Sequence, residues 1–538
     1  MENPNAQTTP DVDSAELLGR FALIRLRRFE RLAAVAEESG SALWRELARS
    51  AARAAYRDYL LLGMAGDAGA ALDPEPTDAR AGDAASSDQP LDQGAAGARA
   101  GDLGEGTALL GAVLPTVIVT APSWKHPPAV RACAPAPGRR PWHRVERCRS
   151  GAPAPRHRRW EGPMKLTDVR LIPVRLRCHD VPSLSHWHST TRYHTIVRLD
   201  ADDGARGWGE ASGLGEPSAL GPDPRRLEAL LRDELAGADA RDVVVLGRRL
   251  RARLGDTPLA RQVRCGVDLA LHDLVGRARG ESASRLLGGA ARSTLRVAYA
   301  IGAHRRVEDV PASIAYIGER LARGFDLIRA YIGLDAAADD LFMAQLGETY
   351  GGRVRIKTLD CNGHLEAKAA LRAIDRYREH EPLLVESPVR RGDLAGLAEV
   401  RRRIRFPVSE HVDGPADALA LVRAGAVDVM NLRCISLGGL VVAREVAAIA
   451  EAAGLACVIG AAHEVNLGTA GQVHLGATLA GHDFPADCIG PETYLEDVTS
   501  TLLRYEGSTL HVPTDPGLGF VVDEARLAEH TVARPPGA

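Results

Sequence analysis

Several common signatures of protein function are missing from this 538-residue sequence. It has no Walker A motif, no Rossmann fingerprint and no G-x-S-x-G nucleophile elbow, so neither a nucleotide cofactor nor serine hydrolysis is supported. Its formal net charge is only −3, which provides no overall attraction to nucleic acid or to an anionic membrane. We therefore expect neither nucleic acid nor membrane among its partners.

Cysteine motifs and long apolar runs are also missing. The eight cysteines form no CxxC pair and are widely spaced, which argues against a zinc knuckle and a disulfide framework. Residues 1–16 are polar and acidic, unlike a signal peptide. The apolar stretch 109–121 holds about 13 residues and a proline, too few to span a bilayer. These features predict a soluble cytoplasmic protein with reduced thiols.

The first 163 residues differ in composition from the rest and predict a poorly structured N-terminal extension. Residues 1–66 carry apolar positions at helical spacing, which predicts a helical segment. Residues 67–163 are first Ala/Gly/Asp-rich and then Arg/Pro/His-rich, which predicts a disordered linker or a basic tether for an anionic partner. Alternatively, translation starts at Met164 and some upstream sequence is an artefact of the gene prediction. The sequence leaves these interpretations open.

From Met164 onward the pattern is regular. Residues 164–290 begin with alternating strands and continue with helical stretches, and beyond 290 short apolar strands alternate with segments of helical periodicity. The expected strands are 295–301, 325–332, 353–360, 382–387, 406–411, 428–434, 456–461 and 486–490. Eight such units predict an α/β fold, a parallel (β/α)8 TIM-type barrel, with its chemistry at the C-terminal ends of the strands.

Three acidic residues fall at successive strand ends. Asp360 ends the third expected strand, Glu386 the fourth and Glu410 the fifth, so three carboxylates are expected side by side at the barrel mouth. Such like charges repel one another unless a cation lies between them, and oxygen ligands suit Mg²⁺, with Mn²⁺ as an alternative. The competing interpretation is that these acids cap helices or pair with arginines. Asn362, two residues after Asp360, supports the metal site and is also a candidate substrate-binding residue.

Several motifs from Met164 to about Glu529 resemble those of the enolase superfamily, in its mandelate racemase/muconate lactonizing enzyme group. They are GWGEA (207–211), ALHDLVGRARGESASRLLGG (270–289), LDCNG (359–363), VESP (385–388), LGGL (437–440) and PGLGF (516–520). The resemblance implies an α+β capping domain over 164–290, completed by 491–530, and a catalytic barrel over 291–490. It also implies abstraction of a proton next to a carboxylate, with a metal ion stabilising the enediolate.

The sequence departs from this family where the family carries Lys-x-Lys on strand 2. The corresponding residues in GFDLIRAYIG are Arg329 and Tyr331. An arginine cannot act as a base, but Tyr331 could if Arg329 and a metal lowered its pKa. On strand 6 the usual Lys or Asp is Arg433, a good anion clamp and a poor base. The alternative is that all three are binding or packing residues.

Further candidates lie on strand 7 and in the cap. Strand 7 ends in GAAHEV, which offers His463 as a general acid or base and Glu464 as the acid often found there. His186 and His188 lie in the expected specificity loop, 183–194, and are candidate substrate-binding residues. Strand alternation places two further side chains away from the site, His411 and Lys357.

The leading functional hypothesis is a Mg²⁺-dependent dehydratase of a hydroxy or sugar acid that acts through an enediolate. Loss of the lysines makes a two-base racemase less favoured and a one-base lyase or cycloisomerase more favoured. The alternatives are therefore a racemase, epimerase or cycloisomerase of the same superfamily, and a barrel that binds metal without catalysis. The expected partners are a small carboxylate substrate and further copies of the chain in a homo-oligomer.

Overall fold

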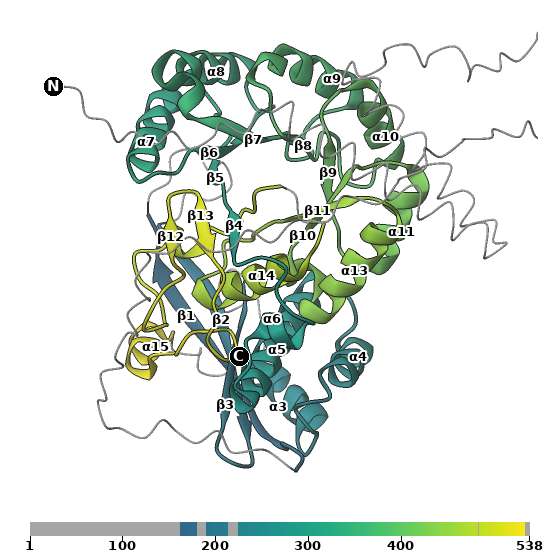
Figure 1. Cartoon of the computed structure of the whole chain (residues 1–538), viewed down its shortest axis with the longest axis vertical. Helices are drawn as coiled ribbons and strands as arrows, with labels where there is room; N and C mark the ends of the chain where they lie inside the picture. Colours follow the sequence, from purple (N-terminus) through teal and green to yellow (C-terminus); the bar gives the residue numbers. More distant parts are fainter. Residues whose placement is uncertain (1–161, 180–189, 213–223, 482–483, 533–538) are drawn as a thin grey trace, which may run out of the picture. The chain divides into compact units, whose positions relative to one another are not determined.

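The computed structural model describes residues 162–179, 190–212, 224–481 and 484–532 (Figure 1). The predicted segment 1–66, all but the last two residues of 67–163, and the candidate residues His186 and His188 lie outside these ranges. No helix within the described ranges is long and apolar enough to cross a membrane.

The N-terminal part of the described chain is an antiparallel sheet covered by helices, in the strand order β1-β2-β3. Its elements are β1 (Leu166–Arg177), β2 (Thr191–Ala201), β3 (Arg206–Ala211), α3 (Pro224–Leu235), α4 (Val243–Leu254), α5 (Pro258–Arg279) and α6 (Ala283–Leu286). The long helix α5 begins where the Thr257 side chain accepts a hydrogen bond from the Ala260 amide at 3.2 Å. It packs closely on β3, because a Cβ atom on Gly209 would lie 2.1 Å from the carbonyl oxygen of Gly266. The cap therefore has a tightly packed sheet–helix core.

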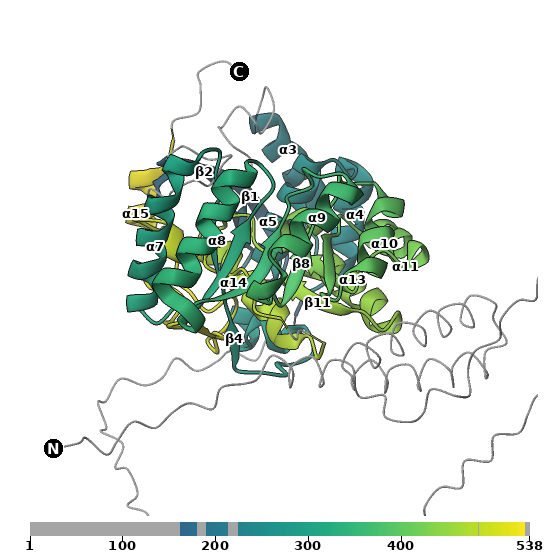
Figure 2. The same ribbon diagram turned by 90° about the horizontal axis from the view of Figure 1, so that it is seen from above.

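Most of the remaining described residues form a parallel barrel surrounded by helices (Figure 2). Seven strands lie in the order β5 to β11: β5 (Tyr299–Ile301), β6 (Leu327–Tyr331), β7 (Arg355–Asp360), β8 (Leu384–Glu386), β9 (Val408–His411), β10 (Val429–Leu432) and β11 (Ala456–Ile459). Figure 2 shows outer helices around them: α7 (Val310–Ala322), α8 (Ala336–Tyr350), α9 (Ala367–Arg376), α10 (Leu394–Arg403), α11 (Pro415–Ala424) and α13 (Leu440–Ala452). The strands are almost entirely buried, as expected for a parallel sheet covered on both faces.

The eighth barrel position is filled by a short stretch of chain and not by a regular strand. The Ala486 amide donates to the Arg296 carbonyl at 2.7 Å on one side, and the Asp487 amide donates to the Ile459 carbonyl at 2.9 Å on the other. These bonds close the barrel as predicted. The prediction of a helix after the eighth strand is wrong, because the chain passes into a 3-10 turn, η5 (Gly490–Thr493), and then joins the cap.

The first expected strand, 295–301, is divided in the structure. Its first part is β4, which pairs with the C-terminal strand β13, and only its second part, β5, joins the barrel sheet. The remaining short elements are β4 (Thr294–Arg296), η2 (Val307–Asp309), η3 (Gly351–Arg353), η4 (Arg378–His380), α12 (Cys434–Leu437), α14 (Asn466–Thr478), β12 (Tyr505–Glu506), β13 (Thr509–His511) and α15 (Glu524–His530). The C-terminal tail thus contacts both the barrel and the cap, since Thr531 bridges to Val174 of β1.

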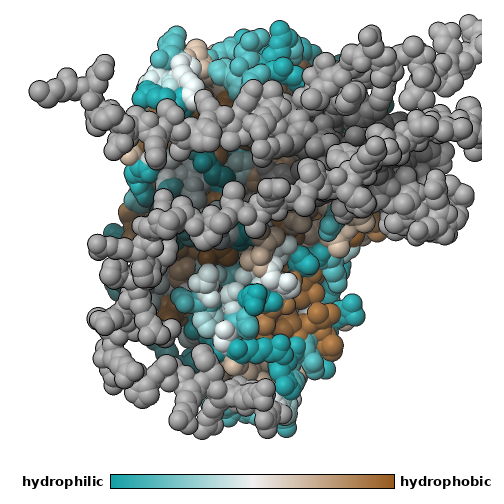
Figure 3. Space-filling model, in the orientation of Figure 1, coloured by the Kyte–Doolittle hydropathy of each residue, from teal (hydrophilic) through white to brown (hydrophobic). Residues whose placement is uncertain are grey.

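One face of the molecule shows how polar and apolar residues are distributed over the helices. Figure 3 shows hydrophilic residues over the outer helices α8 and α9 and a hydrophobic patch over α4. Val244 and Val245 of α4 are 44% and 55% exposed. Polar outer faces are expected for barrel helices, which bury one side against the strands.

A buried carboxylate joins three of the sequence motifs. Asp273 on α5 accepts hydrogen bonds from the amides of Trp208 (3.0 Å) and Leu518 (2.9 Å) and from Nε of Arg277 (2.8 Å). The motifs GWGEA, ALHDL and PGLGF therefore meet at one side chain that has no exposed surface. Their role here is structural, because each backbone amide would otherwise be buried without an acceptor.

Asp339 on α8 supports the loop that follows β6 and gives a test of pH dependence. Its Oδ2 accepts a hydrogen bond from the Gly333 amide at 2.8 Å, while Oδ1 is buried without a hydrogen-bond partner. Burial raises the pKa of Asp339 from 3.8 to about 7. Because the folded-state pKa is the higher one, the neutral carboxyl favours folding. This contribution is complete below the unfolded-state pKa and is lost as the pH rises through 7.

We therefore expect Asp339→Asn to raise the free energy of unfolding by about 2 kcal/mol at pH 8 and to change it little at pH 4. Urea denaturation at both pH values measures the effect. Asp375→Asn, at an exposed position on α9, is the control. An equal effect of Asp339→Asn at both pH values would contradict the assigned ionisation.

Candidate active site

Two carboxylates lie side by side at the mouth of the barrel, as the sequence predicts. Asp360 at the end of β7 pairs in register with Glu386 at the end of β8, and both side chains are buried. Burial raises the pKa of Asp360, which the neighbouring Glu386 charge reinforces and Arg329 opposes. For Glu386, burial alone would raise the pKa, but Arg329 and His411 hold it well below its usual range.

Arg329 lies between these carboxylates. Its Nε and Nη2 donate to Oδ2 of Asp360 at 2.9 and 2.5 Å, and Nη2 also donates to Oε1 of Glu386. Nη1 donates to Oδ2 of Asp487 at 2.6 Å, from the stretch that closes the barrel. The guanidinium therefore binds three buried carboxylates at once and stays charged.

Tyr331 lies beside Arg329, with the guanidinium carbon 5.2 Å from the centre of its ring. Arg329 lowers the pKa of Tyr331, as expected, but its effect is not the largest one. Burial and the nearby carboxylates raise this pKa above its ordinary value, and Arg329 opposes them only in part. The phenol is therefore protonated at neutral pH and suits donation of a hydrogen bond or proton better than abstraction.

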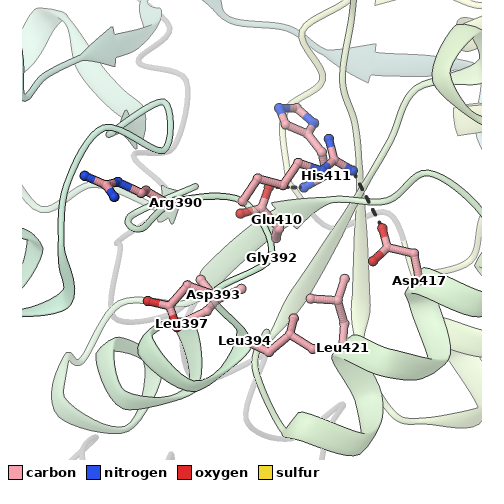
Figure 4. A pocket seen from close by; sticks show the side chains of 10 residues that line it. Arg390, Gly392, Asp393, Leu394, Leu397, Glu410, His411, Asp417 and Leu421 are labelled. Atoms are coloured by element: carbon pink, nitrogen blue, oxygen red, sulfur yellow. Dashed lines mark hydrogen bonds and ion pairs between the residues drawn. The ribbon is translucent and has the colours of Figure 1, made fainter.

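Glu410 does not join Asp360 and Glu386. Its Oε1 accepts from Ser387 Oγ (2.9 Å) and from the His411 amide (2.8 Å). The side chain lines a pocket of about 90 Å³ formed with the Arg390–Leu394 loop and helices α10 and α11. Figure 4 shows the Glu410 carboxyl and the His411 ring pointing in different directions. The predicted convergence of three carboxylates is therefore not present.

The alternation of β9 is opposite to the prediction. Ser409 Oγ donates to Oε2 of Glu386 at 3.0 Å, and Nε2 of His411 lies 3.1 Å from Oε1 of Glu386. Ser409 and His411 thus face the barrel interior, and Glu410 between them faces outward. Burial and the nearby Arg433 lower the pKa of His411 to about 4, so this imidazole is neutral at pH 7. Its Nδ1 is buried and makes no hydrogen bond.

Arg433 follows β10 and faces the same region. Within the described ranges its side chain makes no hydrogen bond or ion pair, and its Nε is buried. Burial lowers its pKa, Glu386 and Glu464 act in the opposite direction, and Arg391 and Arg329 lower it further. A guanidinium remains charged in a protein, so this is a cation that lacks an anion.

His463 and Glu464 have different surroundings. His463 has a left-handed backbone conformation (φ 61°), and its carbonyl accepts a hydrogen bond from the Tyr494 hydroxyl at 2.5 Å. Burial and then the nearby Arg192 and Arg329 lower its pKa to about 3. Glu464 turns back toward its own chain, where Oε2 accepts from the Ala462 amide at 2.8 Å. His463 therefore belongs to a positively charged mouth, and Glu464 supports the loop behind it.

A chain of polar contacts from the cap holds the His463 backbone. His194 Nε2 lies 2.8 Å from the Tyr494 hydroxyl, and His194 Nδ1 lies 3.1 Å from Oε1 of Glu210. Glu210 also accepts from the amides of Val465 (2.9 Å) and Gly468 (2.7 Å), at the start of α14. An anion at a helix N-terminus is favourable, so the GWGEA motif anchors the cap to the barrel mouth.

Two further charged residues of the site were missed by sequence reasoning. Lys357 was expected to point away, but its Nζ lies 2.7 Å from Oδ1 of Asp487 and its side chain is fully buried. A register shift between β6 and β7 at Arg329 places Lys357 toward the interior despite the alternation. Asp487 lay at the second position of the expected eighth strand, 486–490, so the pattern of acidic residues at strand ends gave no signal for it.

Asn362 contributes through its backbone. Its amide donates to Oδ1 of Asp360 at 2.7 Å, and its side chain lies 3.3 Å from His364. Its predicted contact with substrate stays a prediction. The same holds for the roles predicted for His186 and His188, which lie outside the described residues.

The carboxylate oxygens of Asp360 and Glu386, which a divalent metal would need, all have partners within the protein. Oδ1 of Asp360 accepts from the Asn362 amide, and Oδ2 accepts from Arg329. Oε1 of Glu386 accepts from Arg329, and Oε2 accepts from Ser409 and from Asn431 Nδ2 (2.9 Å). In the part of the chain that the structure describes, no three His, Cys, Asp or Glu side chains are grouped to hold a metal ion. The arrangement does not fit the metal site that the sequence predicts.

Known proteins resemble this chain over the described part. Residues 167–288 match the N-terminal domain of the mandelate racemase / muconate lactonizing enzyme family, and residues 314–526 match its enolase C-terminal domain-like barrel. Muconate cycloisomerase 1 of Rhodococcus opacus is 31% identical over 66% of this chain and 96% of its own length. L-Ala-D/L-Glu epimerase of Bacillus subtilis is 30% identical over 62% of this chain and 90% of its own.

Solved structures give the same result. The muconate lactonizing enzyme of Pseudomonas fluorescens, complexed with muconolactone, superposes with a TM-score of 0.62 at 27% identity. The match covers 69% of this chain and all of that one.

Proposed function

Because the chain belongs to the mandelate racemase/muconate lactonizing enzyme group of the enolase superfamily, we propose that it is an isomerase of a small carboxylate, of the cycloisomerase or epimerase type. The relatives favour this alternative over the dehydratase that the sequence suggested, since they are named as cycloisomerases and an epimerase. Enzymes of this family generally use a divalent metal. The expectation of Mg²⁺ is not part of this proposal, because Asp360, Glu386 and Glu410 do not converge.

The proposal rests on the surroundings of Arg433. This residue is a partly buried cation with an enclosed Nε and no anionic partner among the described residues, and it lies near Arg329 and His411 at the ends of the strands. Partial burial of a charge without a partner costs folding free energy, so such a residue is expected to serve a ligand. A carboxylate is the anion whose shape matches a guanidinium, which makes Arg433 the proposed clamp for the substrate.

The proton step is assigned to groups beside that clamp. Epimerisation removes and returns a proton at the carbon next to a carboxylate, and lactone formation on an unsaturated acid delivers a proton to such a carbon. His463 is neutral at pH 7 and is the proposed proton carrier. Binding of an anionic substrate beside it would offset the surrounding arginines and raise its pKa. Tyr331, which stays protonated, is the proposed hydrogen-bond donor to the developing enolate.

Deuterium exchange tests the proposal. The full chain would be incubated in D₂O with two substrate classes, unsaturated dicarboxylates of the muconate type and dipeptides ending in glutamate, and followed by NMR. We expect deuterium at a carbon next to a carboxylate, at a rate that His463→Asn and Arg433→Met strongly reduce. Arg423→Met, at an exposed position on α11, is the control. Absence of exchange in both classes would contradict the proposal. Association into a homo-oligomer stays a prediction, tested by light scattering.

A further inference from the structure

The environment of Asp360 and Glu386 is fully occupied by groups of the chain itself. The four carboxylate oxygens of this pair all accept hydrogen bonds or contact a polar nitrogen: Arg329, Ser409, His411, Asn431 and the Asn362 amide supply the contacts. Both side chains are at most 1% exposed. Any further cation would therefore have to displace bonds that are already made.

The Arg329 guanidinium is positioned as the cation of this pair. One nitrogen, Nη2, bonds to Asp360 Oδ2 and Glu386 Oε1 together, so it stands where an ion shared by the two carboxylates would stand. The rest of the guanidinium is fixed by Asp360 through Nε and by Asp487 through Nη1. Asp487 is held in turn by Lys357 at 2.7 Å. Among the described residues this cluster thus contains three carboxylates, a guanidinium and a lysine side chain before any ion is added.

Glu410, the third predicted metal ligand, is not positioned to complete a metal site with Asp360 and Glu386. Glu410 lies on the outward face of β9, with Oε1 bound to Ser387 and to its neighbour's amide. The inward side chains of β9 are a hydroxyl and an imidazole, Ser409 and His411. A hard divalent cation prefers several anionic oxygen ligands, and the carboxylates grouped here, Asp360, Glu386 and Asp487, are all bound by Arg329 already.

We propose that in this chain the Arg329 guanidinium replaces the divalent metal that is typical of its family, and that substrate carboxylates are bound by Arg433 instead. The inference concerns the same site as the proposed function and rests on it only for the role of Arg433. The guanidinium N–H groups of Arg329 that face Asp360 and Glu386 are all engaged in hydrogen bonds. Arg329 therefore serves to neutralise these two carboxylates and to supply a fixed positive charge at the site. The clamp for the substrate then falls to the arginine that has no protein partner.

Metal binding to the full chain, after dialysis against EDTA, tests this inference without substrate. Mn²⁺ is the probe, followed by the loss of its free electron paramagnetic resonance signal and by the thermal unfolding midpoint. We expect no saturable Mn²⁺ binding below about 1 mM. We also expect no Mn²⁺-dependent rise in the thermal unfolding midpoint of the kind that Asp360→Asn would abolish. One Mn²⁺ per chain bound below about 100 μM, and lost in Asp360→Asn, would overturn the inference.

A second experiment compares Mn²⁺ binding by two substituted chains. Arg329→Met removes the cation and leaves the two carboxylates, so it is expected to bind Mn²⁺ at least about tenfold more tightly than the unmodified chain. Lys357→Met is the matched control, because it removes an interior cation that does not touch Asp360 or Glu386. Equal Mn²⁺ binding by both variants would contradict the role of Arg329. If Arg329→Met does not fold, the measurement on the unmodified chain still decides the question.

The outcome is distinguishable from failure of the proposed function. A chain that exchanges no substrate proton yet binds no Mn²⁺ contradicts the function and leaves the inference standing. A chain that exchanges protons only after Mn²⁺ is added, and binds it through Asp360, supports the function and overturns the inference.

Discussion

Replacing Arg433 with methionine is expected to lower kcat/KM by about 100-fold, mostly through a higher KM. The methionine keeps most of the apolar volume and removes the only described cation at the barrel mouth that has no hydrogen bond or ion pair in the protein. A charge-assisted bidentate contact to a carboxylate is expected to account for most of the loss. Steady-state kinetics on the substrate found by deuterium exchange measures it.

Folding of this variant is not expected to suffer. Because Arg433 is a partly buried charge that forms no ion pair with the described residues, its removal should leave the free energy of unfolding unchanged or raise it slightly. Arg433→Lys is the informative second variant, since a lysine keeps the charge and loses the fork of donors. Full activity in Arg433→Met, with normal folding, would exclude Arg433 as the substrate clamp.

Asp273→Ala is expected to lower the free energy of unfolding by about 3–5 kcal/mol. The substitution leaves the buried amides of Trp208 and Leu518 without an acceptor and Arg277 without its carboxylate partner. Burial raises the pKa of Asp273 and Arg277 opposes this, so the aspartate is costly to bury and is retained for its hydrogen bonds. Urea denaturation followed by tryptophan fluorescence measures the loss.

The control for Asp273 is an acidic residue that makes only surface contacts. Asp375→Ala on α9 removes a carboxylate that is 69% exposed and pairs only with Arg378, so we expect a change below about 0.5 kcal/mol. If Asp273→Ala were equally mild, the three motifs would not be joined through this side chain.

The barrel was predictable because its signal is repeated. Buried strands alternate with helices of matching length, and the chemistry of strand ends placed Asp360 and Glu386 together correctly. The prediction of a full eighth βα unit was wrong because Ala486 and Asp487 close the barrel with two backbone hydrogen bonds. This closure needs no regular strand and no following helix. Composition could not distinguish this minimal closure from a full βα unit.

The direction of side chains was harder to predict than the position of strands. Glu410 and His411 lie on the opposite faces of β9 from those expected. The strand has only four residues, and helices or the barrel shield all of them. Hydrophobic periodicity therefore does not mark which face of the strand is the inner one. Lys357 turned inward because of a register shift that no local pattern reveals. The pairing of Arg329 with Asp360, Glu386 and Asp487 joins residues up to 158 positions apart and follows only from the closed barrel.

The Glu210 anchor limits how a substrate can reach the mouth. If the cap separated from the barrel, the amides of Val465 and Gly468 would lose their hydrogen-bond acceptor. The Glu210 carboxylate would remain beside His194 but would lose its contact with the N-terminus of α14. Each such loss costs about 1–3 kcal/mol, so swinging of the whole cap is an expensive route. Cap and barrel are then expected to melt in one cooperative transition, and substitutions in β3 that loosen the anchor should disturb the geometry of His463 before they disturb the barrel.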